Sequence, residues 1–248
     1  DVYKRQNQLT GSNQHVGNFP GVTVDRKDGQ IIGHANTRIT DLPGIYSIRP
    51  YTQEEIVTRD YIINEKPDGI INIVDATNIE RNLYLTTELI DMDRSMVIAL
   101  NMYDELERSG NTLDYRLLGH MIGVPVVPTV SRTGEGLHKL FDSIISVYEG
   151  RNKAVRHIHV NLGRDIETEI TGIKDALKQD PAVGAHFSPR YLAIKLLERD
   201  DEIEKLVKKS PDHEAIFIMR DEAVARIERN TNEDITSSIA CLLYTSPS

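Results

Sequence analysis

Residues 69–75 read Gly-Ile-Ile-Asn-Ile-Val-Asp, and this stretch decides the fold class. The run is almost continuously apolar, a pattern that predicts a strand buried on both faces of a parallel sheet. Met96–Leu100 is a similar run, and Pro125–Thr129 supplies a third. Strands that alternate with helices predict an α/β fold with a mostly parallel sheet. Ligands bind such sheets at the carboxyl ends of the strands, so candidate site residues are sought there.

Helical spacing fills the segments between these strands, at 53–64, 78–92, 113–122 and 137–148. Gln30–His34 and Asn36–Thr40 predict a hairpin ahead of them. After Gly150 only helical spacing recurs, at 166–177, 189–197, 202–208 and 214–227. We therefore expect an α/β domain over residues 7–150 and a small all-helical domain over residues 151–240.

Composition narrows the class of protein. The chain has 248 residues, enough for a sizeable core in one or two domains. With 29 basic and 38 acidic residues, its net charge of −9 argues against a general binder of nucleic acid or anionic membranes. The single cysteine, Cys241, excludes a disulfide framework and is typical of a reducing compartment. No apolar run approaches the roughly 18 residues of a membrane span, so we expect a soluble, cytoplasmic chain.

The loop Asp41-Leu42-Pro43-Gly44 directly follows the expected strand Asn36–Thr40. An aspartate at a strand end can hold Mg²⁺ through water. A glycine three residues later lets a backbone N–H approach a terminal phosphate, because no side chain intervenes. The loop is thus a candidate phosphate and magnesium site, with an ordinary structural turn as the alternative.

The loop Asn101-Met102-Tyr103-Asp104 follows the strand Met96–Leu100. Guanine presents two adjacent donors, N1–H and the exocyclic amine, and one carboxylate can accept both. Adenine lacks that pair, so Asp104 would impose guanine over adenine. Asn101 would contact the other edge of the base and brace the loop. A turn that merely closes the strand is the alternative.

Two further loops fit the same pattern. Ser131-Arg132-Thr133-Gly134 follows the strand Pro125–Thr129 and would place backbone N–H groups beside the base. Earlier, residues 17–23 read Gly-Asn-Phe-Pro-Gly-Val-Thr and end in a hydroxyl. In a GTPase, Thr23 would coordinate magnesium and sense the third phosphate, which makes this loop a switch. A surface loop before a hairpin is the alternative.

Three stretches resemble one family. Asn7–Val24 resembles the first switch region of the bacterial ferrous-iron transporter family FeoB, and Val74–Thr86 is similar to that family as well. Arg190–Glu198 (Arg-Tyr-Leu-Ala-Ile-Lys-Leu-Leu-Glu) resembles the family's helical domain. The resemblance implies a GTPase domain followed by a helical domain, on the cytoplasmic side of the bacterial inner membrane, with a membrane transport domain as partner.

The resemblance also implies ligands and site residues. GTP and Mg²⁺ are expected, and K⁺ is implied by the family alone. GTP binding falls to Thr23, Asp41, Gly44, Asn101, Asp104 and Ser131, and magnesium to Thr23 and, through water, Asp41. The switch regions contain Gly17, Gly21, Val22, Thr23, Asp41, Leu42, Pro43 and Gly44.

The phosphate loop G-x-x-x-x-G-K-[ST] that such GTPases use is not in the sequence. In the resembled family this loop and the first, central strand lie just before the residues that match Asn7. Residues 1–6 and 241–248 look like translated adaptor sequence, so we expect non-native ends, with divergent natural termini as the alternative. A sheet without its central strand has two unpaired inner edges. We therefore expect this chain to bind GTP weakly, to be inactive and to aggregate, and the upstream reading frame to restore binding.

The sequence leaves three assignments open. No catalytic residue is assigned, since Ile45 follows Gly44 where some GTPases place a water-orienting glutamine nearby. His157 and His159 are a weak metal pair, with a solvated linker as the alternative. An acidic run could attract iron or simply flank a helix; it comprises Glu198, Asp200, Asp201, Glu202 and Glu204.

Two other functions stay open as well. A ribosome- or RNA-associated GTPase would share the Asp41–Gly44 and Asn101–Asp104 loops, but the net charge of −2 after Gly150 disfavours an RNA-binding appendage. A degenerate, non-hydrolysing interaction module would explain the missing phosphate loop.

Overall fold

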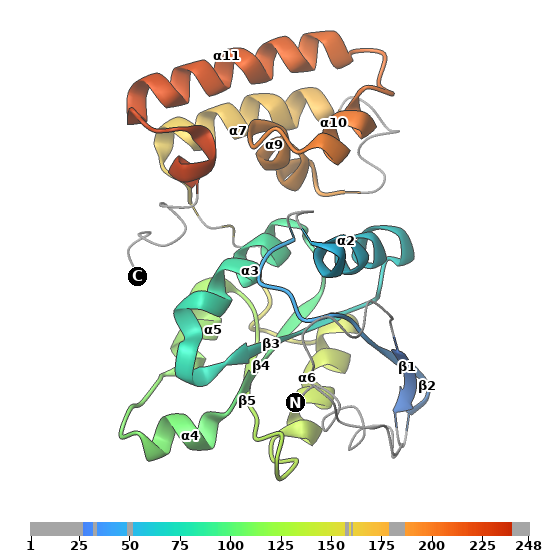
Figure 1. Ribbon diagram of the computed structural model, residues 1–248. Coiled ribbons are helices and arrows are strands. Elements are labelled where there is room, and N and C mark those ends of the chain that lie inside the picture. Colours follow the sequence, from blue (N-terminus) through green and yellow to red (C-terminus); the bar gives the residue numbers. More distant parts are fainter. Residues whose placement is uncertain are drawn as a thin grey trace. The chain divides into compact units, whose positions relative to one another are not determined.

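The computed structural model describes residues 27–31, 34–48, 52–156, 159, 161–178 and 187–239 (Figure 1). The chain divides into two compact units. The first comprises residues 1–86 and 94–158, and the second comprises residues 87–93 and 159–248. Residues 87–91, which end the helix Ile79–Asp91, are therefore part of the second unit, although the rest of that helix belongs to the first.

The first unit begins with a two-stranded antiparallel sheet of β1 (Lys27–Ile31) and β2 (His34–Asp41). Asp28 lies opposite Thr40, and the Thr40 hydroxyl donates a hydrogen bond to Asp28 Oδ1 at 2.5 Å. The predicted hairpin is confirmed, with both strands displaced by a few residues. Asp41, the last residue of β2, opens the loop that leads to the next helix.

A three-stranded parallel sheet forms the centre of the first unit, in the order β3 (Ile70–Asp75), β4 (Met96–Asn101), β5 (Val126–Pro128). Every residue of the central strand β4 is buried, as its apolar run predicts. In β3, Asn72 and Val74 are buried and the other residues are partly buried, so burial on its two faces is less complete than the sequence predicts. The physical reason is position, because β3 is the outer strand of this sheet. Among the described residues, no strand joins the two sheets.

Helices cover both faces of the parallel sheet (Figure 1). On one face, α6 (Leu137–Tyr148) packs its buried Leu140 and Val147 against Val97 and Ala99 of β4. On the other face lies α3 (Ile79–Asp91), since the buried Asn72 amide donates to the Thr86 hydroxyl at 2.8 Å. Side chains alternate across a strand, so Asn72 points away from Ile71 and Ile73, which pack on the α6 side. The α/β fold with both sheet faces covered is thus confirmed.

Shorter helices complete the first unit. Thr52 and Glu55 form a capping box that starts α2 (Gln53–Asp60), which runs on into the π-helix η1 (Tyr61–Glu65). A 3₁₀ turn, η2 (Ala76–Asn78), precedes α3. The remaining two are α4 (Tyr103–Arg108), which the sequence did not predict, and α5 (Tyr115–Ile122).

Helices are the regular elements among the described residues of the second unit, as expected. It contains α7 (Arg164–Leu177), α9 (Pro189–Leu197), α10 (Asp201–Val207) and α11 (His213–Thr231). One face of α7 is fully apolar and buried, with side chains at helical spacing: Ile166, Ile170, Ile173 and Leu177. Every residue of α9 after Pro189 is buried, including two cationic ones, Arg190 and Lys195.

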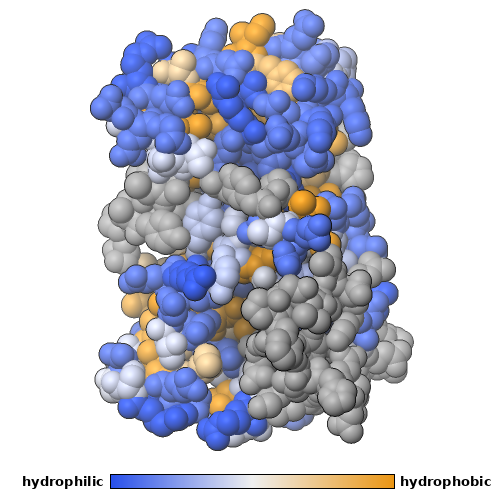
Figure 2. Space-filling model, in the orientation of Figure 1, coloured by the Kyte–Doolittle hydropathy of each residue, from blue (hydrophilic) through white to orange (hydrophobic). Residues whose placement is uncertain are grey.

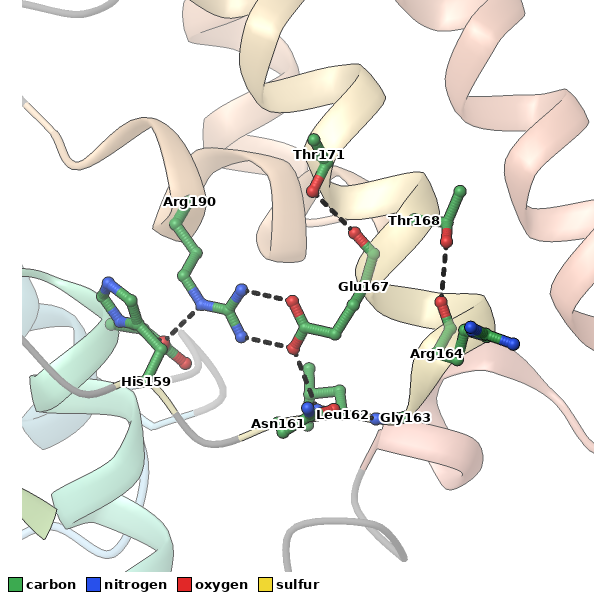
Figure 3. Close-up of polar contacts among 10 residues, drawn as sticks. His159, Asn161, Leu162, Gly163, Arg164, Glu167, Thr168, Thr171 and Arg190 are labelled. Carbon is green, nitrogen blue, oxygen red and sulfur yellow. Dashed lines mark hydrogen bonds and ion pairs between the residues drawn. The ribbon is translucent and has the colours of Figure 1, made fainter.

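Carboxylates surround both buried cations of α9. The Arg190 guanidinium binds Glu167 of α7 with two hydrogen bonds, of 2.7 and 2.8 Å, and Figure 3 shows the two groups face to face. Arg190 Nε also donates to Asp91 Oδ1 at 3.0 Å. Buried charges persist only when they are paired in this way, so these contacts explain why α9 tolerates burial on all sides.

The surface seen in Figure 2 is mostly hydrophilic, with small, separate apolar areas. Among the described residues, no helix combines the length and the apolar character that crossing a bilayer requires.

Candidate functional site

Two predicted site residues meet at the carboxyl ends of β4 and β5. Asn101, the last residue of β4, is 7% exposed. Its Oδ1 accepts hydrogen bonds from the Ser131 N–H at 3.1 Å and from the Ser131 hydroxyl at 2.6 Å. The buried Asn101 side chain therefore joins the loop after β4 to the loop after β5. Because Oδ1 is already bonded, the Asn101 amide nitrogen is the group that remains for a ligand.

A tight turn after β5 places Ser131. The Thr129 N–H donates to the Leu100 carbonyl at 2.8 Å, and Val130 forms an isolated bridge with Glu135. The turn ends at Gly136, whose φ is +82°. A Cβ at Gly136 would lie 2.1 Å from the Pro128 carbonyl oxygen, so only glycine fits. The backbone around Ser131 is thus fixed by local sterics.

Asp104 lies in the first turn of α4, and Met102 turns the chain into that helix with a left-handed backbone (φ +59°). The Asp104 carboxylate, 27% exposed, bonds Arg108 one helical turn later and Arg132 at 3.4 Å. Partial desolvation opposes ionisation, but the hydrogen bonds and charges of Arg108 and Arg132 hold the pKa of Asp104 below its ordinary value. Asp104 is therefore ionised at neutral pH and can accept two hydrogen bonds from a ligand.

Sequence reasoning missed the two arginines as partners of Asp104. The spacing of Asp104 and Arg108, four residues apart, is the usual spacing of an ion pair along one helix face and could have indicated the first contact. Arg132 is 28 residues away in sequence, so only the tertiary structure reveals the second contact.

The loop of Asp41, Leu42, Pro43 and Gly44 follows β2 and belongs to the other sheet of the first unit. Gly44 is exposed, and a Cβ there would meet nothing within 4 Å, which leaves its backbone open to a ligand. The Thr58 hydroxyl donates to the Pro43 carbonyl at 3.3 Å. Beyond the loop, the Arg81 guanidinium lies 3.9 Å from the centre of the half-exposed Tyr46 ring.

The remaining switch residues, Gly17, Gly21, Val22 and Thr23, lie outside the described residues. Of the two predicted magnesium ligands, Thr23 and Asp41, the structure therefore describes Asp41. A single carboxylate fits Mg²⁺, because this ion keeps several waters and takes other ligands from phosphates. In the part of the chain that the structure describes, no group of three or more His, Cys, Asp or Glu side chains could hold a metal ion.

The histidine pair and the acidic run were the weaker candidates for metal binding, and their described members contact neighbouring side chains of the fold. His159 Nδ1 lies 3.3 Å from Asp91 Oδ1, while His157 lies outside the described residues. In the acidic run, Glu198 binds Lys195, Asp200 caps α10, and Glu204 binds Arg220. These contacts support the reading of the run as part of the helical packing.

Family comparisons cover both units. A family model described as ferrous iron transport protein B matches residues 5–144, and one described as the FeoB cytosolic helical domain matches residues 163–245. Among curated relatives, the chain is 44% identical over 226 residues to an Fe(2+) transport protein A/Fe(2+) transporter FeoB fusion protein of Porphyromonas gingivalis. That alignment covers 90% of this chain and 27% of the relative. The FeoB of Escherichia coli is 34% identical over 96% of this chain and 30% of its own length. The chain thus spans less than a third of these relatives.

Solved structures give the same result. NFeoB from S. thermophilus bound to GDP·AlF4⁻ and K⁺ superposes with a TM-score of 0.86 at 35% identity, covering 98% of this chain and 91% of that one. The GMPPNP-type complex of the same protein gives 0.85 at 36% identity, with 98% and 88% coverage. The sequence left three functions open. These matches favour a FeoB-type GTPase domain over an RNA-associated GTPase. The family models and relatives that span both units show that this chain belongs to the FeoB family of ferrous iron transport proteins.

Proposed function

We propose that this chain is the GTP-binding and GTP-hydrolysing cytoplasmic part of a ferrous-iron transporter, and that its switch loops couple hydrolysis to iron uptake by a membrane domain. The observation that carries the proposal is the buried Asn101–Ser131 contact next to the ionised Asp104, at the strand ends where such sheets bind nucleotides. The solved relatives bound to GTP analogues and GDP·AlF4⁻ support it. GTP hydrolysis would take place at the cytoplasmic face of the bacterial inner membrane.

The base-binding half of the site follows from hydrogen-bond chemistry. Asp104 would accept N1–H and the exocyclic amine of guanine after exchanging at least one of its arginine contacts. The Asn101 amide nitrogen would donate to the opposite edge of the base, and the Ser131 N–H remains with Asn101. Adenine would leave the Asp104 carboxylate without a donor, which is the basis of selectivity.

The phosphate half would use the loop after β2. The Gly44 N–H would face the terminal phosphate, and Asp41 and Thr23 would hold Mg²⁺, Asp41 through water. Bound Mg²⁺ neutralises charge on the phosphate oxygens. Hydrolysis transfers the terminal phosphoryl group to water. We assign the positioning of that water to switch backbone and bound ions, and we include K⁺ among these ions because the solved relative binds it.

The test is Asp104→Asn, measured in this chain and in an extended chain that carries a first strand and a phosphate loop ahead of Asn7. Xanthine carries a carbonyl where guanine carries the exocyclic amine, so an amide at position 104 pairs with xanthine rather than guanine. We expect a fluorescent guanine nucleotide to bind the extended chain tightly and this chain weakly. Asp104→Asn should weaken guanine binding by at least about 100-fold, the cost of an unmatched buried hydrogen-bonding group, and favour xanthine.

A matched control is Asp114→Asn, which changes an exposed aspartate at the start of α5. It should leave nucleotide preference unchanged. Equal binding of guanine and adenine nucleotides by the extended chain, or no change in preference on Asp104→Asn, would contradict the proposal.

A further inference from the structure

Three large apolar side chains are exposed on α5 and beside its C-terminal end. Leu117 and Met121 are 53% and 43% exposed and lie one turn apart, so they form a stripe along one face of the helix. Val155 is 40% exposed. The next residue, Arg156, donates from its backbone N–H to the Gly123 carbonyl at 3.1 Å and from its guanidinium to the His120 carbonyl at 2.5 Å. Val155 therefore lies at the end of the Leu117–Met121 stripe.

Cations flank this apolar stripe. Arg116 is exposed on α5, one residue before Leu117. Lys153 and Arg156 are exposed beside Val155. Within the described part of the chain, Arg116, Lys153 and Arg156 form no ion pair with a carboxylate, whereas the nearby Arg151 is paired with Glu149. We call Arg116, Leu117, Met121, Lys153, Val155 and Arg156 the α5 patch.

We propose that the α5 patch docks this part of the chain onto an anionic lipid surface. Apolar side chains that enter the headgroup region, surrounded by cations that contact lipid phosphates, are the combination that interfacial helices use. An RNA backbone would match the cations but leave Leu117, Met121 and Val155 in water, and so it fits the patch less well.

The net charge of −9 does not oppose this docking at close range. The Debye length is about 8 Å at physiological ionic strength, so acidic groups elsewhere on the surface are screened from a lipid that contacts the patch. Near the patch, the three cations Arg116, Lys153 and Arg156 outnumber the exposed Asp114 at the start of α5, so the local charge is net positive. The same argument predicts strong salt dependence, because each exposed cation acts through a screened interaction.

The test is flotation of the purified 248-residue chain with vesicles, in which aggregates remain at the bottom and only vesicle-bound protein rises. Vesicles contain phosphatidylcholine alone or with about one third phosphatidylglycerol, an anionic lipid. We expect flotation only with the anionic vesicles, and its loss when the salt concentration is raised. Arg116→Gln with Lys153→Gln should lower the partition coefficient by about 25-fold, at roughly fivefold for each cation. Leu117→Ser with Met121→Ser should lower it about as much, since both side chains are exposed and removing them leaves the core intact.

Matched controls lie in the second unit. Lys208→Gln with Lys209→Gln removes two exposed cations, and Ile218→Ser removes an apolar side chain that is 61% exposed. Neither should change flotation. The proposal is overturned if the anionic vesicles bind the chain no better than neutral ones, or if the control variants reduce binding as much as the patch variants do. It is also overturned if the chain binds RNA through the patch residues but does not bind vesicles.

Discussion

Lys195 Nζ lies 2.8 Å from Glu88 Oε1 inside the second unit, and the lysine side chain is only 3% exposed. Glu198 Oε2 accepts from the same ammonium group at 2.9 Å. Burial by itself lowers the pKa of Lys195, but attraction from Glu88 and then Glu198 outweighs it and raises the pKa above its ordinary value. The lysine is therefore charged in the core of a helical unit, and it joins the last turn of α3 to α9.

Removing this ammonium should strongly destabilise the second unit. Lys195→Met keeps the volume but leaves two buried carboxylates without their shared cation, which costs about 3–5 kcal/mol. Urea denaturation followed by circular dichroism measures the loss. Lys205→Met is the control, because Lys205 pairs with Glu202 on the surface, and it should leave the midpoint unchanged. Similar midpoints for the two variants would contradict this account.

Acid should weaken the second unit through Glu167. Desolvation opposes ionisation of this carboxyl, but hydrogen bonds from Arg190 and the Leu162 N–H lower its pKa below the ordinary value of 4.5. A carboxyl whose pKa is depressed on folding adds stability above the unfolded pKa and loses it as pH falls through the folded pKa. Urea midpoints of the wild type should thus fall below pH 4.5, and Glu167→Gln should flatten this dependence. An unchanged slope in the variant would refute the assignment.

Gly136→Ala should disrupt the loop that carries Ser131. The added Cβ would lie 2.1 Å from the Pro128 carbonyl oxygen, and φ is +82°, so backbone must move at a cost of about 3 kcal/mol or more. Gly150→Ala separates the two effects, since its φ is +67° but nothing lies within 4 Å of the new Cβ. It should cost only about 1–2 kcal/mol, the price of a left-handed alanine. Thermal denaturation measures the stability of both variants. Equal losses of stability would show that the contact between the new Cβ and the Pro128 carbonyl oxygen is unimportant.

Asn101→Ala should destabilise the first unit, and Thr129→Val should not. The alanine removes the acceptor of the buried Ser131 N–H and hydroxyl, which costs about 1–3 kcal/mol. Thr129 Oγ1 is buried and has no hydrogen-bond partner in the described structure, so an apolar side chain of the same shape should be neutral or stabilising. Urea midpoints measure both changes. A destabilised Thr129→Val variant would reveal a partner that this structure does not show.

Local patterns predicted most elements but missed those that depend on distant residues. Leu137–Tyr148 and Pro189–Leu197 match the observed helices residue for residue, because apolar periodicity and a proline at the helix start are local signals. The six-residue α4 was missed because so short a helix shows no periodicity. It also follows Met102, whose left-handed backbone conformation is unusual for a methionine. The incomplete burial of β3 was missed because it depends on the strands beside β3, which its own residues do not specify.

The sequence alone determined the α/β class, the strand-end position of Asn101, Asp104 and Ser131, and the resemblance to FeoB, because each depends on residue type and spacing along the chain. Only the tertiary structure decided which side chains meet. The Asn101–Ser131 contact, the Arg132–Asp104 pair and the binding of Lys195 to Glu88 join residues 30, 28 and 107 positions apart. Such contacts depend on strand order and helix packing, where hydrophobic burial brings distant segments together and pairing then makes the buried charges tolerable.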